Sequence, residues 1–377
     1  MKINIAVWWV LDYETGTRET LGGLERWTRD LVIELVSRGH EVNVFQKSAV
    51  EYKRSYHGAD IHGIPCSKNF IGNIAFYNRF KKLCGGEELT LFVSQDLLWG
   101  SHFKKAVAVN HGVWWSSRQS KLKRYAIEKF NEHYLRRAKK TICVDTNYIN
   151  WVIESVDGAH EIVNRLAYIP NYFDPALFEN FSASEEQNSS INILFPRRIM
   201  GVSVESEPRG GEDAIRALAL VRKRGVDASL TMLGEGNLST QLKTLASDLG
   251  VAEFVKFATA HFDDMPKFYA EHDVVFVPSR FSEGTSLSAI EGLAAGCFVI
   301  GSCVGGLQNL PLFFPYGDMV VPEPLALANS VEQYAKKVHV NSSRSNVGRA
   351  EAVGRFAISN WKKSVLRVMS EIAVQDI

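Results

Sequence analysis

The chain lacks the features that mark several classes of protein. Its 377 residues carry 43 Lys and Arg against 42 Asp and Glu, a net charge of +1. Such a balance excludes a chain that is disordered through charge excess, and it excludes a dedicated nucleic-acid binder, whose domain would be strongly basic. We therefore expect no nucleic acid among the partners. At roughly 150 residues per domain, the length predicts about two domains.

Cysteine is scarce and long apolar runs are missing. The five cysteines are widely spaced and form no C-x-x-C pair, which predicts neither a zinc site nor a disulfide framework. They are typical of reduced thiols in a cytosolic protein. No run approaches the roughly 18 apolar residues of a membrane span. The apolar start at Met1–Leu11 has no small-residue cleavage site, so it predicts a strand and not a signal peptide.

Two ligand-binding patterns are also absent. No D-x-D triplet occurs, whereas a diphosphate site built on Mg²⁺ or Mn²⁺ needs carboxylates placed together. Asp263 and Asp264 are adjacent and predict only a loop. We therefore expect neither a metal ion nor a cofactor. No G-x-G-x-x-G follows the first predicted strand, which disfavours a dinucleotide-dependent oxidoreductase.

The hydrophobic pattern predicts two tandem α/β units. Ile3–Val10 is typical of a buried parallel strand, the apolar residues within 24–35 recur at helical spacing, and 41–46 alternates as a second strand. A Ser-, Asn- and Glu-rich stretch near 180–192 separates this pattern from a second one. We expect a first domain at 1–175, a linker at 176–192, a second domain at 193–352 and a C-terminal helix at 353–377.

The most informative segment is Pro278–Gly306, in which seven residues separate Glu283 from Glu291. Glu283 lies in a Gly/Ser/Thr loop after a predicted strand, and Glu291 lies within the next helix. The loop thus brings a carboxylate, free amides at 284–287 and the positive end of a helix to the carboxyl edge of a sheet, which suits an anionic or hydroxyl-rich ligand. Taken alone, the spacing also fits a helix cap followed by a solvated glutamate.

This segment resembles the E-x7-E signature of the retaining glycosyltransferases of family four. The resemblance extends along most of the chain through Gly22-Gly23, Ile169-Pro170-Asn171 and Gly234-Glu235-Gly236. It implies an α/β fold of the GT-B type, with two Rossmann-like domains facing an interdomain cleft. It also implies that the C-terminal helix crosses back to the first domain.

The same resemblance implies a donor site in the second domain. Arg198 and Arg209 would clamp the diphosphate, with Arg209 in place of the family's Lys and after about seven extra residues, and Arg suits phosphate well. Glu283 would lie beside the transferred sugar, and Glu291 would accept hydrogen bonds from the ribose. Further donor-binding positions would be Gly234, Gly236, Gly284, Thr285, Ser286 and Leu287.

The first domain would hold the acceptor. Gly22 and Gly23 would bring backbone amides close to the diphosphate and the acceptor. By resemblance, His111 would approach the donor sugar and complete a catalytic set with Glu283 and Arg198. The stretch 118–140 contains nine Lys and Arg. It is either a solvated helix face or a contact with anionic lipid headgroups.

The function that the resemblance implies is that of a retaining, metal-independent glycosyltransferase. It would move a sugar from a nucleotide-sugar to a hydroxyl of a glycan or lipid-linked acceptor, as in bacterial-type cell-surface polysaccharide or lipopolysaccharide biosynthesis. We expect a cytoplasmic location, with peripheral contact at the inner face of the cytoplasmic membrane. The alternatives are a nucleotide-sugar epimerase or phosphorylase of the same fold, or a non-catalytic nucleotide-sugar-binding relative.

Overall fold

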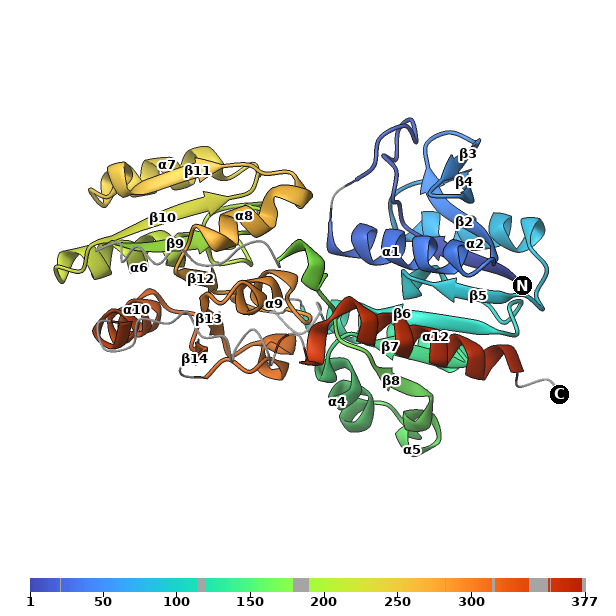
Figure 1. The fold of residues 1–377 in the computed structure, drawn as a ribbon. Coiled ribbons are helices and arrows are strands. Elements are labelled where there is room, and N and C mark those ends of the chain that lie inside the picture. The colour runs from blue at the N-terminus through green and yellow to red at the C-terminus, as the bar shows by residue number, and fades with distance from the viewer. Residues whose placement is uncertain are drawn as a thin grey trace. The chain divides into compact units, whose positions relative to one another are not determined.

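The chain divides into two compact units. The computed structural model describes residues 1–20, 22–113, 120–178, 190–281, 283–313, 316–338, 352 and 354–374. One unit comprises Met1–Pro170 with Trp361–Ile377, and the other comprises Asn171–Asn360 (Figure 1). Of the expected linker, 176–178 and 190–192 fall within the second unit, and 179–189 lie outside the described residues.

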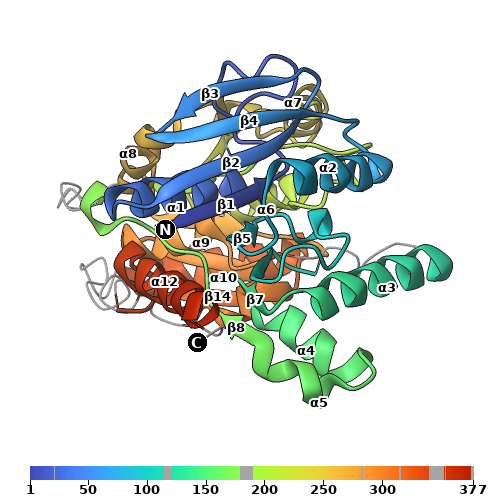
Figure 2. The ribbon, with the colours of Figure 1, turned by 90° about the vertical axis from the view of Figure 1, so that its right-hand side faces the viewer.

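Unit 1 is built on an eight-stranded sheet in the order β3-β4-β2-β1-β5-β6-β7-β8. Figure 2 shows β3, β4, β2 and β1 from top to bottom. The strands are β1 (Lys2–Val7), β2 (Glu41–Ser48), β3 (Tyr52–Tyr56), β4 (Ala59–Pro65), β5 (Leu89–Phe92), β6 (Ala106–Asn110), β7 (Lys140–Cys143) and β8 (Leu166–Tyr168). Every pair is parallel except the β3–β4 hairpin.

The helices of unit 1 pack through apolar stripes. They are α1 (Gly23–Ser37), α2 (Phe70–Leu83), α3 (Lys121–Arg137), α4 (Thr146–Ser155), α5 (Ala159–Ile162) and most of α12 (Ile358–Val374), with the short 3₁₀ turn η1 (Gln95–Leu97) after β5. In α1, Trp27 and Leu31 are each 1% exposed, which follows from their spacing on one helical face. The Trp361 ring of α12 meets the Trp27 ring edge to face at 5.1 Å. The C-terminal helix is therefore part of the core of unit 1.

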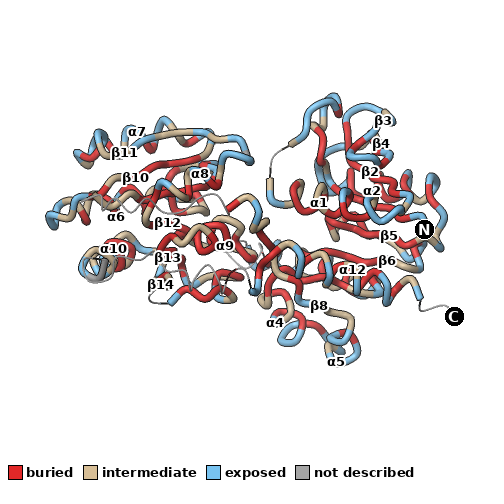
Figure 3. Tube along the Cα trace, viewed as in Figure 1, coloured by how far each residue is buried: buried red, intermediate tan, exposed pale blue. Residues whose placement is uncertain are grey.

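Unit 2 contains a parallel six-stranded sheet with helices on both faces. Its order is β11-β10-β9-β12-β13-β14. The strands are β9 (Ile191–Phe195), β10 (Ala228–Leu233), β11 (Val255–Ala258), β12 (Val274–Val277), β13 (Phe298–Ser302) and β14 (Gly317–Val320). The helices α6 (Gly211–Lys223), α7 (Ser239–Asp248) and α10 (Pro324–Val338) cover one face, and α8 (Met265–Ala270) and α9 (Leu287–Ala294) cover the other. Figure 3 shows the central strands buried between these layers.

In each sheet the chain first adds strands on one side of its first strand and then adds the later strands on the other side. In unit 1 the chain goes from β1 outward to β2 and returns to β5 on the other side of β1. In unit 2 it goes from β9 outward to β10 and β11 and returns to β12 on the other side of β9. Open α/β sheets bind ligands at the carboxyl ends of the strands at such a reversal. The fold therefore predicts one ligand position in each unit, at β1/β5 and at β9/β12.

Candidate functional site

Three donors converge on one carboxylate at the β9/β12 reversal of unit 2. Arg197 follows β9 and Glu283 lies in the loop after β12; Arg197 Nη2 is 2.6 Å from Glu283 Oε2. Arg209 Nη1 is 2.5 Å from the same oxygen, and Ser279 Oγ donates to it at 2.7 Å. Two guanidinium groups meet at one carboxylate, and a guanidinium group with free donors suits an anionic ligand.

The electrostatics of this cluster keep Glu283 ionised. Burial alone would raise the pKa of the carboxyl group, but the charges of Arg197 and Arg209 and the Ser279 hydroxyl outweigh it and lower the pKa. The Arg197 side chain is 7% exposed, whereas that of Arg209 is 40% exposed. Arg209 is thus the more accessible of the two cations for a bound anion.

Arg197 is a site residue that the sequence analysis missed. The expected clamp residue was Arg198, whose side chain is exposed in the structure and has no ion pair among the described residues. Arg197 is buried and donates to Glu283, whereas Arg198, one position further on, is exposed. No local pattern distinguishes Arg197 from Arg198, because the burial of Arg197 depends on its contact with Glu283, 86 positions further along the chain. A phosphate-binding role for Arg198 stays a prediction.

A tight loop holds Arg209 in place. Glu207 is 1% exposed; its two carboxylate oxygens accept hydrogen bonds from the backbone amides of Arg209 at 2.7 Å and Gly211 at 2.9 Å. Gly210, which precedes α6, has a φ of 80°, and a Cβ added there would collide with the carbonyl oxygen of Pro278. The insertion of about seven residues that precedes Arg209 therefore ends in a loop that packs directly against the end of β12.

The ion pairs of Arg280 connect this insertion to the loop that carries Glu283. Arg280 binds Asp213 through Nε at 2.5 Å and Nη2 at 2.7 Å, and its Nη2 lies 2.9 Å from Glu212. Its Nη1 donates to the carbonyl oxygens of Val204 and Glu205. Because Arg280 follows β12, it fixes the insertion and the start of α6 to the segment that carries Glu283.

Glu291 is a buried carboxylate inside α9. It is 6% exposed, and its Oε2 accepts a hydrogen bond from the Tyr269 hydroxyl at 3.0 Å. Burial, and then the neighbouring Glu291 charge, raise the pKa of Tyr269 well above its usual value, so the phenol stays a donor. The hydrogen bond from Tyr269 was not expected from the sequence, because the two residues lie 22 positions apart.

The predicted residues at the start of α9 lie close to the arginine cluster. Ser286 immediately precedes α9 and its Oγ is 3.5 Å from Arg197 Nη1. Thr285 is 1% exposed, and its carbonyl oxygen accepts from Asn171 Nδ2 at 2.7 Å. The amides of 284–287, including those of Gly284 and Leu287, precede or begin the helix. They provide donors beside Glu283.

Gly234 and Gly236 let the turn after β10 approach the segment after β9. A Cβ on Gly234 would collide with the carbonyl oxygen of Arg197, and one on Gly236 would collide with that of Ile199. The Gly234 φ of 154° also disfavours a side chain. These glycines thus bring the turn against the arginine-bearing segment.

The predicted residues of unit 1 lie near its own carboxyl edge. Gly22 is the N-cap of α1 and Gly23 is its first residue. His111 follows β6; its Nε2 lies 3.1 Å from the carbonyl oxygen of Val93, and its ring meets that of Trp27 edge to face. Burial lowers the pKa of His111 to about 4, so the ring is neutral at physiological pH. Its expected role toward a donor sugar stays a prediction.

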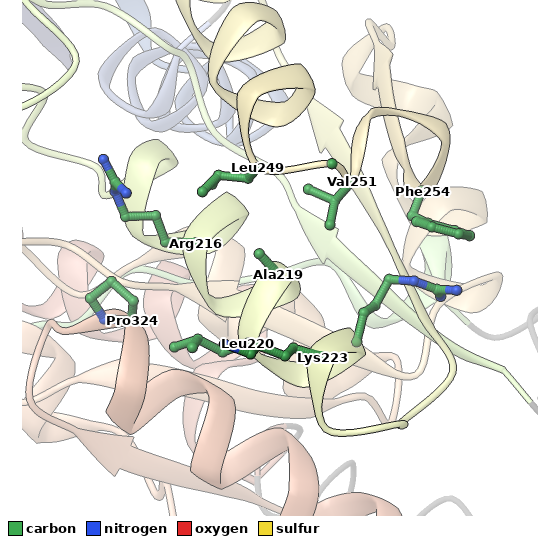
Figure 4. A pocket seen from close by; sticks show the side chains of 10 residues that line it. Arg216, Ala219, Leu220, Lys223, Leu249, Val251, Phe254 and Pro324 are labelled. Atoms are coloured by element: carbon green, nitrogen blue, oxygen red, sulfur yellow. The ribbon is translucent and has the colours of Figure 1, made fainter.

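A cavity of about 570 Å³ lies elsewhere in unit 2 (Figure 4). It is lined by Arg216, Ala219, Leu220, Arg222, Lys223, Leu249, Gly250, Val251, Phe254 and Pro324. These residues come from the outer helix layer around α6 and the end of α7, and none is a predicted site residue. Across the described ranges no group of three His, Cys, Asp or Glu side chains is placed to hold a metal ion.

Comparisons with known proteins point to glycosyltransferases in both units. Residues 21–177 match the family model "Glycosyltransferase Family 4", and residues 198–337 match the model "Glycosyl transferases group 1". A GDP-mannose-dependent alpha-(1-6)-phosphatidylinositol monomannoside mannosyltransferase from Mycolicibacterium smegmatis is 30% identical over 167 residues, which cover 41% of this chain and 42% of that protein. A D-inositol 3-phosphate glycosyltransferase from Pseudarthrobacter chlorophenolicus is 29% identical over 46% of this chain and 40% of that protein. The chain thus spans less than half the length of either relative.

Solved structures share the whole fold. Sucrose-phosphate synthase from Thermosynechococcus elongatus has a TM-score of 0.80 at 18% identity, with both chains covered completely. HepE from Anabaena, in complex with UDP-glucose, has a TM-score of 0.75 at 17% identity and covers 98% of this chain and 100% of its own. The predicted α/β fold class of the GT-B type, with two Rossmann-like domains, is confirmed.

Proposed function

We propose that this chain, both of whose units match glycosyltransferase family models, is an enzyme that moves a sugar from a nucleotide-sugar to an acceptor hydroxyl. The observation that carries the proposal is the pair of guanidinium groups of Arg197 and Arg209 on Glu283 at the β9/β12 reversal. A nucleotide-sugar is an anion with a diphosphate leaving group, and fixed cations stabilise the charge that develops on it. HepE, a neighbour in fold, is recorded in complex with UDP and with UDP-glucose, which supports a donor of this class.

The proposed reaction proceeds with retention and without a metal ion. The acceptor oxygen forms a bond to the anomeric carbon, the bond from that carbon to the diphosphate breaks, and the departing diphosphate takes the acceptor's proton. Arg209 and the amides at the start of α9 stabilise the diphosphate, as Arg198 also would in our prediction. Glu283 accepts hydrogen bonds from the sugar, and Glu291 accepts them from the ribose. In this scheme the arginines supply the positive charge that other glycosyltransferases take from a divalent ion.

Incubation with labelled nucleotide-sugars tests the reaction class. A transferase releases nucleotide at a rate that rises with acceptor, an epimerase converts the donor without one, and a phosphorylase requires inorganic phosphate. A non-catalytic relative binds nucleotide and never turns over. Thermal shifts with UDP, GDP, ADP and CDP identify the base first, and unchanged turnover in EDTA supports the metal-free scheme. Turnover that is lost in EDTA and restored by Mg²⁺ or Mn²⁺ contradicts it.

We further propose that α3 contacts an anionic membrane, which fits a lipid-linked acceptor and a role in cell-surface polysaccharide or lipopolysaccharide biosynthesis. Three pairs neutralise part of its charge: Arg124–Glu128, Lys129–Glu132 and Arg136–Glu132. Lys121 and Lys123 at the exposed start of the helix flank Leu122, which is 80% exposed, and Tyr125 is 59% exposed. Cations around exposed apolar side chains suit an anionic lipid surface. Among the described residues, no helix combines the length and apolar character needed to span a bilayer.

Liposome flotation tests the membrane contact. Vesicles of phosphatidylcholine with phosphatidylglycerol should bind the wild-type chain at low salt and release it at high salt. The double substitution Lys121→Glu with Lys123→Glu should abolish binding. The matched double substitution Lys223→Glu with Lys256→Glu, which makes the same charge change on unit 2, should leave it intact. Equal flotation of both variants would contradict this proposal and leave the transferase assignment standing.

A further inference from the structure

The β1/β5 reversal of unit 1 holds a polar cluster that the proposed donor site does not use. Trp8 directly follows β1, and Asp96 lies in η1, which begins three residues after the end of β5. Lys47 is the penultimate residue of β2, and Asn73 lies in the first turn of α2. All four residues therefore lie toward the carboxyl edge of the unit 1 sheet, where the topology predicts a ligand.

Asp96 is the centre of this cluster. Its Oδ2 accepts hydrogen bonds from Asn73 Nδ2 at 2.7 Å and from the indole Nε1 of Trp8 at 3.2 Å. Lys47 is 1% exposed and donates to Asn73 Oδ1 at 2.6 Å. Asn73 thus stands between the carboxylate and the lysine, and within the described part of the chain Asp96 has no ion pair. If Lys47 and Asp96 served only as a structural salt bridge, their charged groups would be in direct contact.

The surroundings of Asp96 leave it able to accept a further hydrogen bond. Burial, against the opposing effects of Asn73 and Lys47, raises the pKa of Asp96 to about 6, so the carboxylate is ionised at neutral pH. A carboxylate has about four acceptor positions. Asn73, Trp8 and the backbone amide of Asp96 itself occupy three of them. Capacity for a hydroxyl donor therefore remains.

An open aromatic surface adjoins this carboxylate. Trp8 is 38% exposed although its indole N–H is bound to Asp96. The Trp9 ring lies 6.0 Å from that of Trp8. Gln46 fixes the following backbone, because its Oε1 accepts from the amides of Val10 and Leu11 at 3.0 Å each. The indole is thus held in position before any ligand arrives.

We propose that Trp8 and Asp96 form a subsite for a neutral hydroxylated ring, a sugar or cyclitol unit of the acceptor. The apolar face of such a ring packs on an indole, while its hydroxyls donate to a carboxylate. A phosphate group would be repelled by Asp96, so this subsite selects the neutral ring. As an acceptor subsite it rests on the proposed transferase function, but the binding of the ring itself does not.

Saturation-transfer NMR on the full-length chain tests the subsite. The probes are the methyl α-D-pyranosides of glucose, mannose and galactose for the sugar arm, and myo-inositol for the cyclitol arm. At least one ring should bind to the wild type. Asp96→Asn, which keeps the shape and removes the charge, should weaken this binding by about tenfold or more, because hydrogen bonds to charged groups are among the stronger ones. Trp8→Ala, which removes the ring surface, should act in the same direction.

Asp60→Asn is the control, since Asp60 is an exposed carboxylate of β4 paired with Lys53 in the same unit. It should bind the ring as the wild type does. The subsite is disproved when no probe binds to the wild type, or when Asp96→Asn and Trp8→Ala both bind as the wild type does. Thermal shifts with UDP and GDP on the same samples report the donor site. If the wild type binds neither nucleotide, the proposed function is refuted, and the proposed ring-binding subsite still stands.

Discussion

At the residue scale, Glu283 and its two arginines act as one electrostatic unit. Replacing Glu283 by Gln removes the charge that holds Arg197 and Arg209 and weakens the hydrogen-bond acceptor for the sugar. We expect kcat/KM to fall by about 100-fold or more. Initial-rate measurements with a labelled nucleotide-sugar check this. The control is Glu253→Gln, an exposed glutamate of unit 2, which should keep wild-type kinetics. Wild-type kcat/KM in Glu283→Gln would refute the assignment of this cluster.

Substitutions of the adjacent residues Arg197 and Arg198 distinguish a structural role from a phosphate-binding role. Arg197 is buried against Glu283, so Arg197→Ala should lower both stability and kcat/KM. Arg198 is exposed, so Arg198→Ala should leave the urea midpoint unchanged. If Arg198 binds the diphosphate, as the family resemblance implies, its kcat/KM should nevertheless fall by about 100-fold. Wild-type kinetics in Arg198→Ala would contradict this role and leave Arg209, with the amides at the start of α9, as the phosphate-binding groups.

Asp96 gives a pH signature for the unit 1 cluster. Its folded pKa of about 6 lies above the ordinary value of 3.8. The folded state therefore binds the proton more tightly, and the stability of the wild type relative to Asp96→Asn should fall as pH rises from about 4 to about 6. The full shift sets an upper bound of about 3 kcal/mol. Urea midpoints of both proteins across this range measure it, and a pH-independent difference would contradict the raised pKa.

Some site residues could not be predicted from the sequence, for a physical reason. The signature segment predicted that Glu283, Ser286 and Glu291 belong together in one loop and helix, because these positions are close along the chain. It did not reveal Arg197 or Tyr269, which reach the two carboxylates from other elements. Which of two neighbouring side chains reaches a partner on another element depends on packing that only the folded structure defines.

At the scale of elements, periodicity predicted the buried strands and missed the exposed ones. The strands expected at Ile3–Val10 and 41–46 are present within a few residues as β1 and β2, because their apolar residues follow a strand pattern. The β3–β4 hairpin was missed, since residues 53–55 of β3 are polar and exposed. The C-terminal helix expected at 353–377 is described as α12, from Ile358 to Val374. The formation of an edge strand depends mainly on pairing with its neighbouring strand, and the pattern of apolar residues does not predict that pairing.

The loop before α6 gives a matched test of backbone geometry. Gly210 and Gly225 have nearly the same φ, 80° and 81°, but only at Gly210 would a Cβ meet other atoms. Gly225→Ala should therefore cost about 1 to 2 kcal/mol of stability from the left-handed backbone and leave activity unchanged. Gly210→Ala should cost more and also lower kcat/KM, because the collision with Pro278 displaces Arg209. Urea denaturation and initial rates measure the two effects, and equal behaviour of the two variants would contradict this role of the loop.

At the scale of the whole molecule, one unit is continuous in sequence and the other is not. The second unit is continuous from Asn171 to Asn360, whereas the first is completed by Trp361–Ile377 from the far end of the chain. The 3.6-residue pattern predicted a C-terminal helix, and the family resemblance implied its return to the first domain. Its partners could not be derived from local pattern, because they lie more than 200 positions away. Within unit 1, Lys362 Nζ lies 2.9 Å from Glu34 Oε2 on α1, beside the Trp361–Trp27 contact.

The C-terminal helix should therefore stabilise unit 1 and not unit 2. Trp361 is 3% exposed, and replacing a buried Trp by Ala typically costs about 3 to 5 kcal/mol. In Trp361→Ala, hydrogen exchange should accelerate at the amides of α1, while those of β9 in unit 2 keep their protection. Lys363→Ala, at the exposed neighbouring position of the same helix, serves as the control. Equal acceleration in both units would instead mean that they unfold as a single cooperative block, in which case the C-terminal helix supports the whole chain.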